Sequence, residues 1–169
     1  AFDRYNNNND LGWLENSEYK KKIKFILGDI RDYDSVYKSM KNCDAVIHLA
    51  ALIGIPYSYI SPTAYLKTNV EGTLNILESA KNLKVKQAIV TSTSEVYGSK
   101  LTGKLNEQDE VKAQSPYAAS KVAADQLSLS YYRSFNLPIK IIRPFNTFGP
   151  RQSARAVIPT ICLLYTSPS

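Results

Sequence analysis

Short apolar runs alternate with stretches of helical periodicity along most of this chain. The apolar runs have the length of buried strands and cover residues 24–27, 44–49, 87–90 and 140–142, while residues 1–4 have the pattern of a strand end. Strands that alternate with crossover helices form a parallel sheet covered by helices. The pattern therefore predicts an α/β fold.

Several helical stretches begin with a recognisable N-terminal cap. Asp32 precedes a short stretch, and Ser61 and Ser115 are each followed by a proline, which suits the first position of a helix. We expect these helices to run to about residues 40, 81 and 135. A long polar loop is expected over residues 98–114, and no repeat or linker divides the chain.

Composition fits one globular domain with a sizeable core, because 44% of the 169 residues are hydrophobic and 21% are charged. The formal net charge of +6 comes from scattered basic residues, apart from Lys20, Lys21 and Lys22, which we expect on a solvated face. This charge suits ligands that carry pyrophosphate, and no nucleic-acid partner is expected. Cys43 and Cys162 lie far apart, so neither a disulfide nor a metal site is predicted, and Cys43 is expected to be buried.

The longest apolar stretches, such as residues 45–53, are shorter than the ~18 residues that a membrane span needs. No secretory signal opens the chain, so we expect a cytoplasmic protein without membrane contact. Helical periodicity that starts at residue 156 is poorly continued after residue 161. Residues 162–169 match a translated sequencing adapter, and we expect them to be a non-native tail.

The strongest local candidate for chemistry is the pair Tyr117 and Lys121, near the start of a predicted helix. Their i, i+4 spacing places the phenol and the ammonium on one helix face. A cation beside a phenol favours its ionised form, so Tyr117 can act as a base toward a substrate hydroxyl. Taken alone, the same spacing is more often that of an ordinary surface pair.

A second candidate lies at residues 91–98, directly after a predicted strand. Thr93, Ser94 and Glu95 supply hydroxyls and a carboxylate there. Parallel sheets place their ligand crevice at the carboxyl ends of the strands, so these side chains can face a site. The alternative is a Ser- and Thr-rich turn that only caps the strand. His48 lies inside an apolar strand, and we expect a core histidine rather than a catalytic one.

Together the two segments resemble the extended short-chain dehydrogenase/reductase superfamily of sugar-nucleotide epimerases and dehydratases. Further segments share the resemblance in the family's order and spacing: Gly28–Asp32, His48–Ala51, Thr68–Thr73 and Arg143–Arg151. The resemblance implies a doubly wound, Rossmann-like parallel sheet that is incomplete at the N-terminus, since the family's glycine-rich loop lies before Ala1. We therefore expect residues 1–161 to form a partial NAD(P)-binding domain without most of the substrate domain, inactive on its own.

The resemblance implies a catalytic set of Thr93, Ser94, Glu95, Tyr117 and Lys121. In the family, the tyrosine takes the proton of the sugar 4-hydroxyl while the C4 hydride passes to the nicotinamide. Glu95 stands where 4,6-dehydratases carry the base that removes the C5 proton before the C6 hydroxyl leaves. Ser94 departs from the aspartate of glucose-type dehydratases, and the same triplet resembles UDP-glucuronate decarboxylases. Decarboxylation, 4-epimerisation and a catalytically silent dinucleotide-binding relative therefore stay open.

NAD is the implied cofactor. Asp3 lies at the end of what would be the family's second strand, where a carboxylate accepts from the ribose 2'-hydroxyl and repels a 2'-phosphate, whereas the adjacent Arg4 would tolerate NADP. The positions that match the family's cofactor contacts are Asp3, Arg4, Asp29, Ile30, Leu49, Ala50, Ala51, Asn69, Tyr117, Lys121 and Pro144.

Residues 51–59 and 150–160 resemble the UDP-N-acetylglucosamine 4,6-dehydratases of the legionaminic-acid pathway. Arginine in the second segment suits a diphosphate, because its planar fork donates two parallel hydrogen bonds, although a solvated helix start is the alternative. The implied UDP-sugar site consists of Tyr57, Ser58, Thr93, Asn146, Arg151 and Arg155.

The helix that carries Tyr117 also carries Tyr131, Tyr132 and Phe135. In this family the corresponding helices pack into a dimer-forming four-helix bundle, so the resemblance implies a homodimer. The spacing of the aromatic residues equally fits packing within one core.

Overall fold

Short parallel strands form two separate sheets in the computed structural model of the chain, which describes residues 1–6, 11–154 and 156–166. In the first sheet β1 (Phe2–Arg4) pairs with β2 (Ile26–Gly28). The second has the order β3 (Ala45–His48), β4 (Gln87–Thr91) and β5 (Ile139–Ile142), also parallel, so the carboxyl ends of its strands lie at one edge. The predicted strands are confirmed, with ends displaced by at most two residues.

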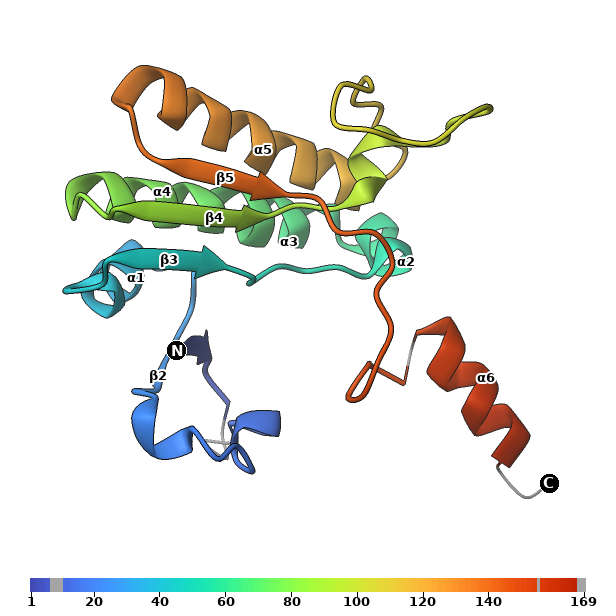
Figure 1. Cartoon of the computed structure of the whole chain (residues 1–169), viewed down its shortest axis with the longest axis horizontal. Coiled ribbons are helices and arrows are strands. Elements are labelled where there is room, and N and C mark those ends of the chain that lie inside the picture. Colours follow the sequence, from blue (N-terminus) through green and yellow to red (C-terminus); the bar gives the residue numbers. More distant parts are fainter. Residues whose placement is uncertain (7–10, 155, 167–169) are drawn as a thin grey trace.

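One face of the three-stranded sheet is covered by α4 (Gly72–Asn82) and α5 (Pro116–Phe135), which pack against each other (Figure 1). Helix α1 (Tyr33–Met40) lies beside α4 and contacts β2. Along β4, Ala88 and Val90 are buried and their neighbours only partly so. The buried core between these elements consists of Ile30, Val36, Met40, Ile76, Leu77, Ala80, Val85, Val90, Tyr131 and Leu137.

Two of the predicted helix caps are formed. The Asp32 side chain accepts from the Asp34 N–H at 3.1 Å at the start of α1, and Ser115 accepts from the Ala118 N–H at 3.0 Å at the start of α5. Helix α5 ends where Asn136 takes the left-handed conformation, with φ of 53°. The predicted bounds of both helices are therefore confirmed.

The helix predicted from about residue 61 to residue 81 consists of α3 (Pro62–Tyr65), a π-helical stretch labelled η3 (Leu66–Glu71), and α4. Ser61 is the N-cap residue of α3 and is followed by Pro62, as predicted, but its side chain forms no capping hydrogen bond. It lies directly after α2 (Ile55–Ile60), a helix that the pattern did not predict. π-Helical turns are frequent at functional sites. Here the π stretch carries a buried Asn69.

The opposite face of the three-stranded sheet is open in the described part of the chain. Ile47 of β3 and Ile142 of β5 are 63% and 45% exposed, and β3 is not paired with β1. Helix α6 (Val157–Thr166) stands away from both sheets (Figure 1). It continues past residue 161, so the expected end of helical structure there is wrong: the next five residues contain no Gly or Pro to stop the helix.

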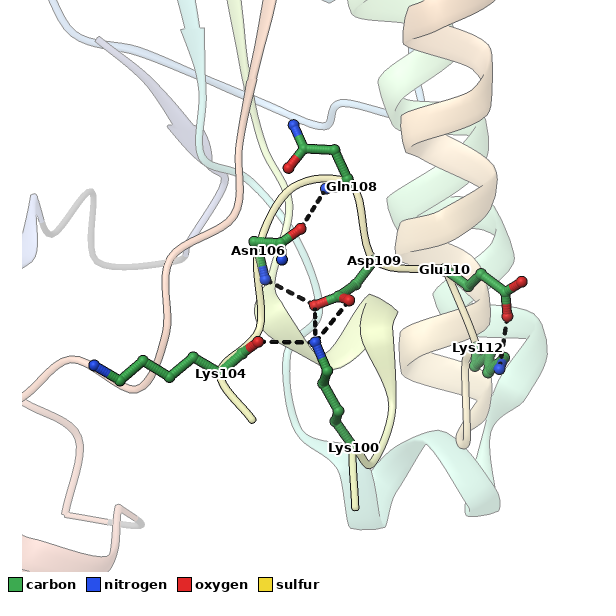
Figure 2. A network of polar contacts seen from close by, with 7 residues as sticks. All are labelled: Lys100, Lys104, Asn106, Gln108, Asp109, Glu110 and Lys112. Atoms are coloured by element: carbon green, nitrogen blue, oxygen red, sulfur yellow. Dashed lines mark hydrogen bonds and ion pairs between the residues drawn. The ribbon is translucent and has the colours of Figure 1, made fainter. Parts of the chain in front are cut away.

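Residues 98–114 form the predicted long loop, which an ion pair closes on itself (Figure 2). Lys100 Nζ lies 2.7 Å from Asp109 Oδ1. Gly98 begins the loop with φ of 65°, and a Cβ there would lie 2.3 Å from the Lys112 carbonyl oxygen. The two ends of the loop therefore approach each other at a position that only glycine fits.

Short 3-10 turns form η1 (Gly12–Leu14), η2 (Lys20–Lys22) and η4 (Ser94–Tyr97). The lysines of η2 are exposed, which confirms the predicted solvated face. Cys43 is also exposed, so its expected burial is wrong: it lies in the surface turn after α1. Across the described ranges, no helix is long and apolar enough to cross a membrane. The same ranges hold no group of His, Cys, Asp or Glu residues suited to a metal ion.

Candidate active site

The segment after β4 turns at Thr93, which caps η4. Its hydroxyl oxygen accepts from the Glu95 N–H at 3.2 Å, so the proposed strand-end turn does exist. Thr93 is 9% exposed, and Ser94 and Glu95 are half-buried. The segment is also fixed to the chain that follows β5, because the Ser94 N–H donates to the Pro144 carbonyl oxygen at 3.1 Å. The turn therefore presents its side chains from a rigid base.

Tyr117 and Lys121 lie in the first turns of α5 with their side chains turned inward. They are 7% and 4% exposed, so they are not an ordinary surface pair. Lys121 Nζ donates to the Thr91 carbonyl oxygen at 2.6 Å, which ties α5 to the end of β4. This contact holds the ammonium at the strand end, one helical turn along α5 from the tyrosine.

The phenol of Tyr117 is surrounded by the side chains that the strand end and α3 supply. Tyr65 packs edge-on against it, with ring centroids 6.2 Å apart. Burial raises the pKa of Tyr117, and the nearby Glu95 carboxylate and Tyr65 raise it further, whereas a hydrogen bond with the Thr93 side chain lowers it. The phenol is therefore protonated in this state, and added positive charge is needed to ionise it near neutral pH.

The ionisable groups near Tyr117 are strongly desolvated. Burial lowers the pKa of Lys121, which the Asp125 carboxylate opposes. Burial, together with the charge of Lys121, lowers the pKa of His48 to about 4. His48 Nε2 lies 3.0 Å from the Thr73 hydroxyl, which itself donates to the Asn69 carbonyl oxygen at 2.6 Å. His48 therefore carries its proton on Nε2 and is the core histidine that the sequence predicts.

Asn69 joins separate segments of the site from within the π stretch. Its Oδ1 accepts from the Leu52 N–H at 2.8 Å, and its Nδ2 donates to the Leu52 carbonyl oxygen and to the Ser120 hydroxyl, both at 2.9 Å. Ser120 in turn donates to the Tyr117 carbonyl oxygen at 2.7 Å. Asn69 thus holds the chain that leaves β3 against the first turn of α5.

The other residues predicted to contact a dinucleotide follow β1, β2 and β3. Asp3 and Arg4 are exposed at the end of β1. Asp29 is paired with Arg31, and this hydrogen-bonded contact lowers the pKa of the Asp29 carboxyl, while Ile30 packs into the core. The positions after β3 are exposed or half-buried, namely Leu49, Ala50 and Ala51.

The predicted substrate residues lie in more exposed positions. Tyr57 on α2 is 51% exposed, and Asn146 and Arg151 are exposed on the chain after β5. Ser58 is instead fully buried and donates its hydroxyl to the carbonyl oxygen of the residue three positions earlier, at 2.6 Å. It therefore faces the interior rather than the open side of α2. Arg155 lies outside the described residues.

The structure adds residues that sequence reasoning did not select. The ring of Tyr65 lies 6.2 Å from the rings of both Tyr57 and Tyr117 and so connects the exposed and buried sides. Asp125 forms an ion pair with Arg143 beside the buried lysine. The aspartate had a signal, because it continues the i, i+4 spacing of the tyrosine and lysine. Tyr65 had no such signal, because no sequence motif relates it to Tyr57 or Tyr117.

The chain matches the family described as GDP-mannose 4,6 dehydratase over residues 1–167. Among curated proteins, it is 36% identical over 148 residues to a dTDP-glucose 4,6-dehydratase of Streptomyces antibioticus, which covers 88% of this chain and 44% of that protein. The chain therefore spans less than half the length of this relative.

Solved structures of nucleotide-sugar enzymes have the same fold. A double mutant of a dTDP-glucose 4,6-dehydratase from Streptomyces venezuelae, with NAD bound, gives a TM-score of 0.81 at 34% identity over 84% of this chain and 44% of that one. A UDP-N-acetylglucosamine 4-epimerase from Methanobrevibacter ruminantium M1 gives a TM-score of 0.83 at 34% identity, over 90% of this chain and 51% of that one. These similarities confirm the Rossmann-like fold.

Proposed function

The chain belongs to the GDP-mannose 4,6 dehydratase family, and on this premise we propose that the complete protein is an NAD-dependent nucleotide-sugar 4,6-dehydratase. One observation carries the proposal: Thr93 and Tyr117 are both buried, and Glu95, half-buried in the turn that Thr93 caps, is near enough for its carboxylate to raise the pKa of Tyr117. A 4-epimerase needs only the first two groups. A carboxylate in the same pocket supplies a second base, as elimination requires.

The proposed roles follow from these positions. Tyr117 takes the proton of the sugar 4-hydroxyl, with Thr93 holding that hydroxyl in place. The bound nicotinamide supplies the hydride acceptor for C4 and later the donor for C6. Glu95 takes the C5 proton, which the new ketone makes acidic, and C5 regains a proton from water when C6 later receives the hydride. Before that, the C6 hydroxyl leaves as water after gaining a proton. Ser94 is half-buried beside Glu95 and has no acidic group, so Glu95 is the side chain that can deliver this proton.

The residues after β1 and β3 fit the adenosine and nicotinamide ends of a dinucleotide. Asp3 is an exposed carboxylate at a strand end, able to accept from ribose hydroxyls, and Leu49 is 69% exposed where an apolar side chain gains from being covered. NAD is the proposed cofactor, as in the Streptomyces venezuelae structure. Replacing Asp3 by Ala in the complete protein should relax the preference for NAD over NADP. Unchanged discrimination would remove Asp3 from the cofactor site.

UDP-N-acetylglucosamine is the proposed substrate, supported by the resemblance of residues 51–59 and 150–160. The test is product analysis with UDP-N-acetylglucosamine, dTDP-glucose and UDP-glucuronate. A 4-keto-6-deoxy product supports dehydration, and the preferred nucleotide sugar identifies the substrate. A 4-epimer alone, or released carbon dioxide, would replace this proposal by epimerisation or decarboxylation. NAD binding without any product would identify a silent relative.

A matched pair of variants isolates the carboxylate. Glu95→Gln should lower formation of the dehydrated product by about 10²- to 10⁴-fold, because the C5 proton loses its base. Glu110→Gln, in the exposed loop, should leave turnover unchanged. Equal turnover in Glu95→Gln and the unmodified protein would contradict the role of Glu95.

We also propose that the complete protein supplies a strand between β1 and β3 and forms a homodimer through α4 and α5. The second edge of β3, which pairs with no strand in the described residues, and the 63% exposed Ile47 support the first point. The exposed Tyr132 and Phe135 at the end of α5 support the second. Amides of β3 should exchange hydrogen more slowly in the complete protein than in this chain alone. Sedimentation should give a dimer that Tyr132→Lys weakens, whereas a monomer would contradict the interface.

A further inference from the structure

Asp125 is a buried carboxylate with no part in the proposed reaction. It lies on α5, one helical turn after Lys121, and is 1% exposed. Arg143, just after β5, approaches it from the other side: Arg143 Nε and Nη2 each lie 3.0 Å from Asp125 Oδ2. A charge this far from water needs compensation, because burial alone raises the pKa of Asp125.

Arg143 is held in place by a second partner. Its Nη1 donates to the Tyr97 hydroxyl at 2.8 Å, and its guanidinium carbon lies 5.0 Å from the centre of the Tyr97 ring. Asp125 Oδ1 has no well-formed hydrogen bond in the described part of the chain, although the Ser92 hydroxyl is close enough to lower the pKa of Asp125. The carboxylate is therefore the meeting point of α5, η4 and the chain segments that follow β4 and β5.

This region holds two cations but only one anion that acts on both of them. Lys121 and Arg143 are cations, and Asp125 is the anion that acts on both. Of the other groups around Lys121, His48 is neutral above pH of about 4 and Tyr117 is protonated, while the Thr91 carbonyl oxygen accepts from the ammonium. The Glu95 carboxylate acts on Tyr117 by raising the pKa of its phenol.

We infer that Asp125, which pairs with Arg143 and lies one helical turn after the buried Lys121, is a positioning residue that keeps the Lys121 side chain charged near Tyr117. Without the carboxylate, the buried ammonium would lose the anion that favours its charged form while the Arg143 cation stayed in the same region, so the ammonium would release its proton more readily. The inference builds on the proposed function, in which Tyr117 is the base, and on the expectation that a cation beside the phenol, here Lys121, favours its ionised form. It predicts that Asp125 sets the upper pH limit of activity without touching the substrate.

The test uses the complete protein with Asp125→Asn, Arg143→Met and the double variant. The pKa of Lys121 is read by NMR titration of ε-¹⁵N-labelled lysine, assigned with Lys121→Met, and the alkaline limb of kcat is measured in parallel. Asp125→Asn should move both to lower pH by at least about one unit. The double variant should recover most of this shift, because the opposing cation is gone. Asp44→Asn, in an exposed pair with Lys86, is the control and should change neither.

An unchanged Lys121 titration in Asp125→Asn, or a double variant as strongly shifted as the single one, overturns the inference. Arg143→Met keeps the test decisive if Asp125→Asn does not fold: it should raise the pKa of Lys121, and a fall or no change overturns the inference. The titration needs no turnover. An inactive protein with the expected shifts therefore refutes the proposed function alone, whereas an active protein without them refutes this inference alone.

Discussion

The buried and exposed sides of the candidate active site are built differently. Thr93, Tyr117 and Lys121 are each less than a tenth exposed. Thr93 caps the turn after β4, the ring of Tyr117 packs against Tyr65, and Lys121 donates to the end of β4. Tyr57 and Asn146, assigned to the substrate, are exposed on α2 and on the chain after β5. The groups proposed for oxidation at C4 are thus preorganised, whereas those proposed to select the sugar nucleotide are open to solvent.

This difference separates chemistry from specificity. Side chains held by packing need no rearrangement before reaction, which favours catalysis. Exposed side chains gain their geometry only when a ligand or another part of the complete protein covers them. Changes on the buried side should therefore alter rate or stability strongly, and changes on exposed segments should alter them weakly.

The largest effect is expected for Tyr117→Phe in the complete protein. The substitution keeps the ring that packs against Tyr65 but removes the proton acceptor, so kcat should fall by about 10²- to 10⁴-fold. Tyr37→Phe, on α1 away from the site, is the matched control and should keep full turnover. Steady-state kinetics and a thermal melt measure both. A Tyr117→Phe variant with normal kcat would contradict the proposed base.

The next effect is a loss of stability at acidic pH caused by His48. Its pKa is about 4 in the folded chain and about 6.5 in an unfolded one, so folding favours the neutral form. The stability it contributes is complete above the unfolded pKa and is lost as the pH falls from about 6.5 toward 4, a total of roughly 3 kcal/mol.

Urea unfolding from pH 7 to pH 4.5 measures this loss. His48 is the single histidine of the chain, so a His48→Gln variant provides a clean reference in which the carboxylates still titrate. The difference between the two stability curves should narrow steadily below pH of about 6.5. A constant difference would mean that His48 is not protonated on unfolding in this range.

Asn69→Ala tests the link between the two sides. The substitution should lower the free energy of unfolding by about 1–3 kcal/mol, because the Leu52 amide and carbonyl and the Ser120 hydroxyl lose their buried partner. Hydrogen exchange should also rise at Leu52, ahead of α2 and its exposed tyrosine. Asn82→Ala is the control: this side chain is exposed and donates to one tyrosine hydroxyl, so a much smaller loss is expected. Equal losses of stability in the two variants would mean that Asn69 does not hold the chain after β3 against α5.

Much of the buried side could be predicted because its signals are local. The i, i+4 spacing of Tyr117 and Lys121 and the position of Thr93 after a strand are visible in the sequence, and capping and sheet topology then bring them together. The direction in which a side chain points was harder to predict. The inward turn of Ser58 depends on a bond within α2, a helix that the apolar pattern did not reveal.

Contacts between distant segments were the least predictable. Tyr65 reaches Tyr117 because α3, together with the π-helical stretch that follows it, packs against α5. Arg143 reaches Asp125 only once β5 lies beside β4 and α5 covers the sheet. Hydrophobic periodicity indicates which face of one element is apolar, but it does not indicate which elements contact each other. The chemistry was therefore easier to predict than the network that supports it.

The smallest effect is expected in the loop of Figure 2, where charges pair on an exposed segment. Lys100 Nζ contacts the Asp109 carboxylate at 2.7 Å and the Lys104 carbonyl oxygen at 2.8 Å, whereas Lys112 pairs with Glu110 in full contact with solvent. Lys100→Met should lower stability only slightly, and Lys112→Met should not lower it measurably, because water and salt screen such pairs. Urea unfolding at low and high salt measures both. Should Lys100→Met instead impair turnover, this loop would belong with the preorganised side of the site, and exposure alone would not separate the two.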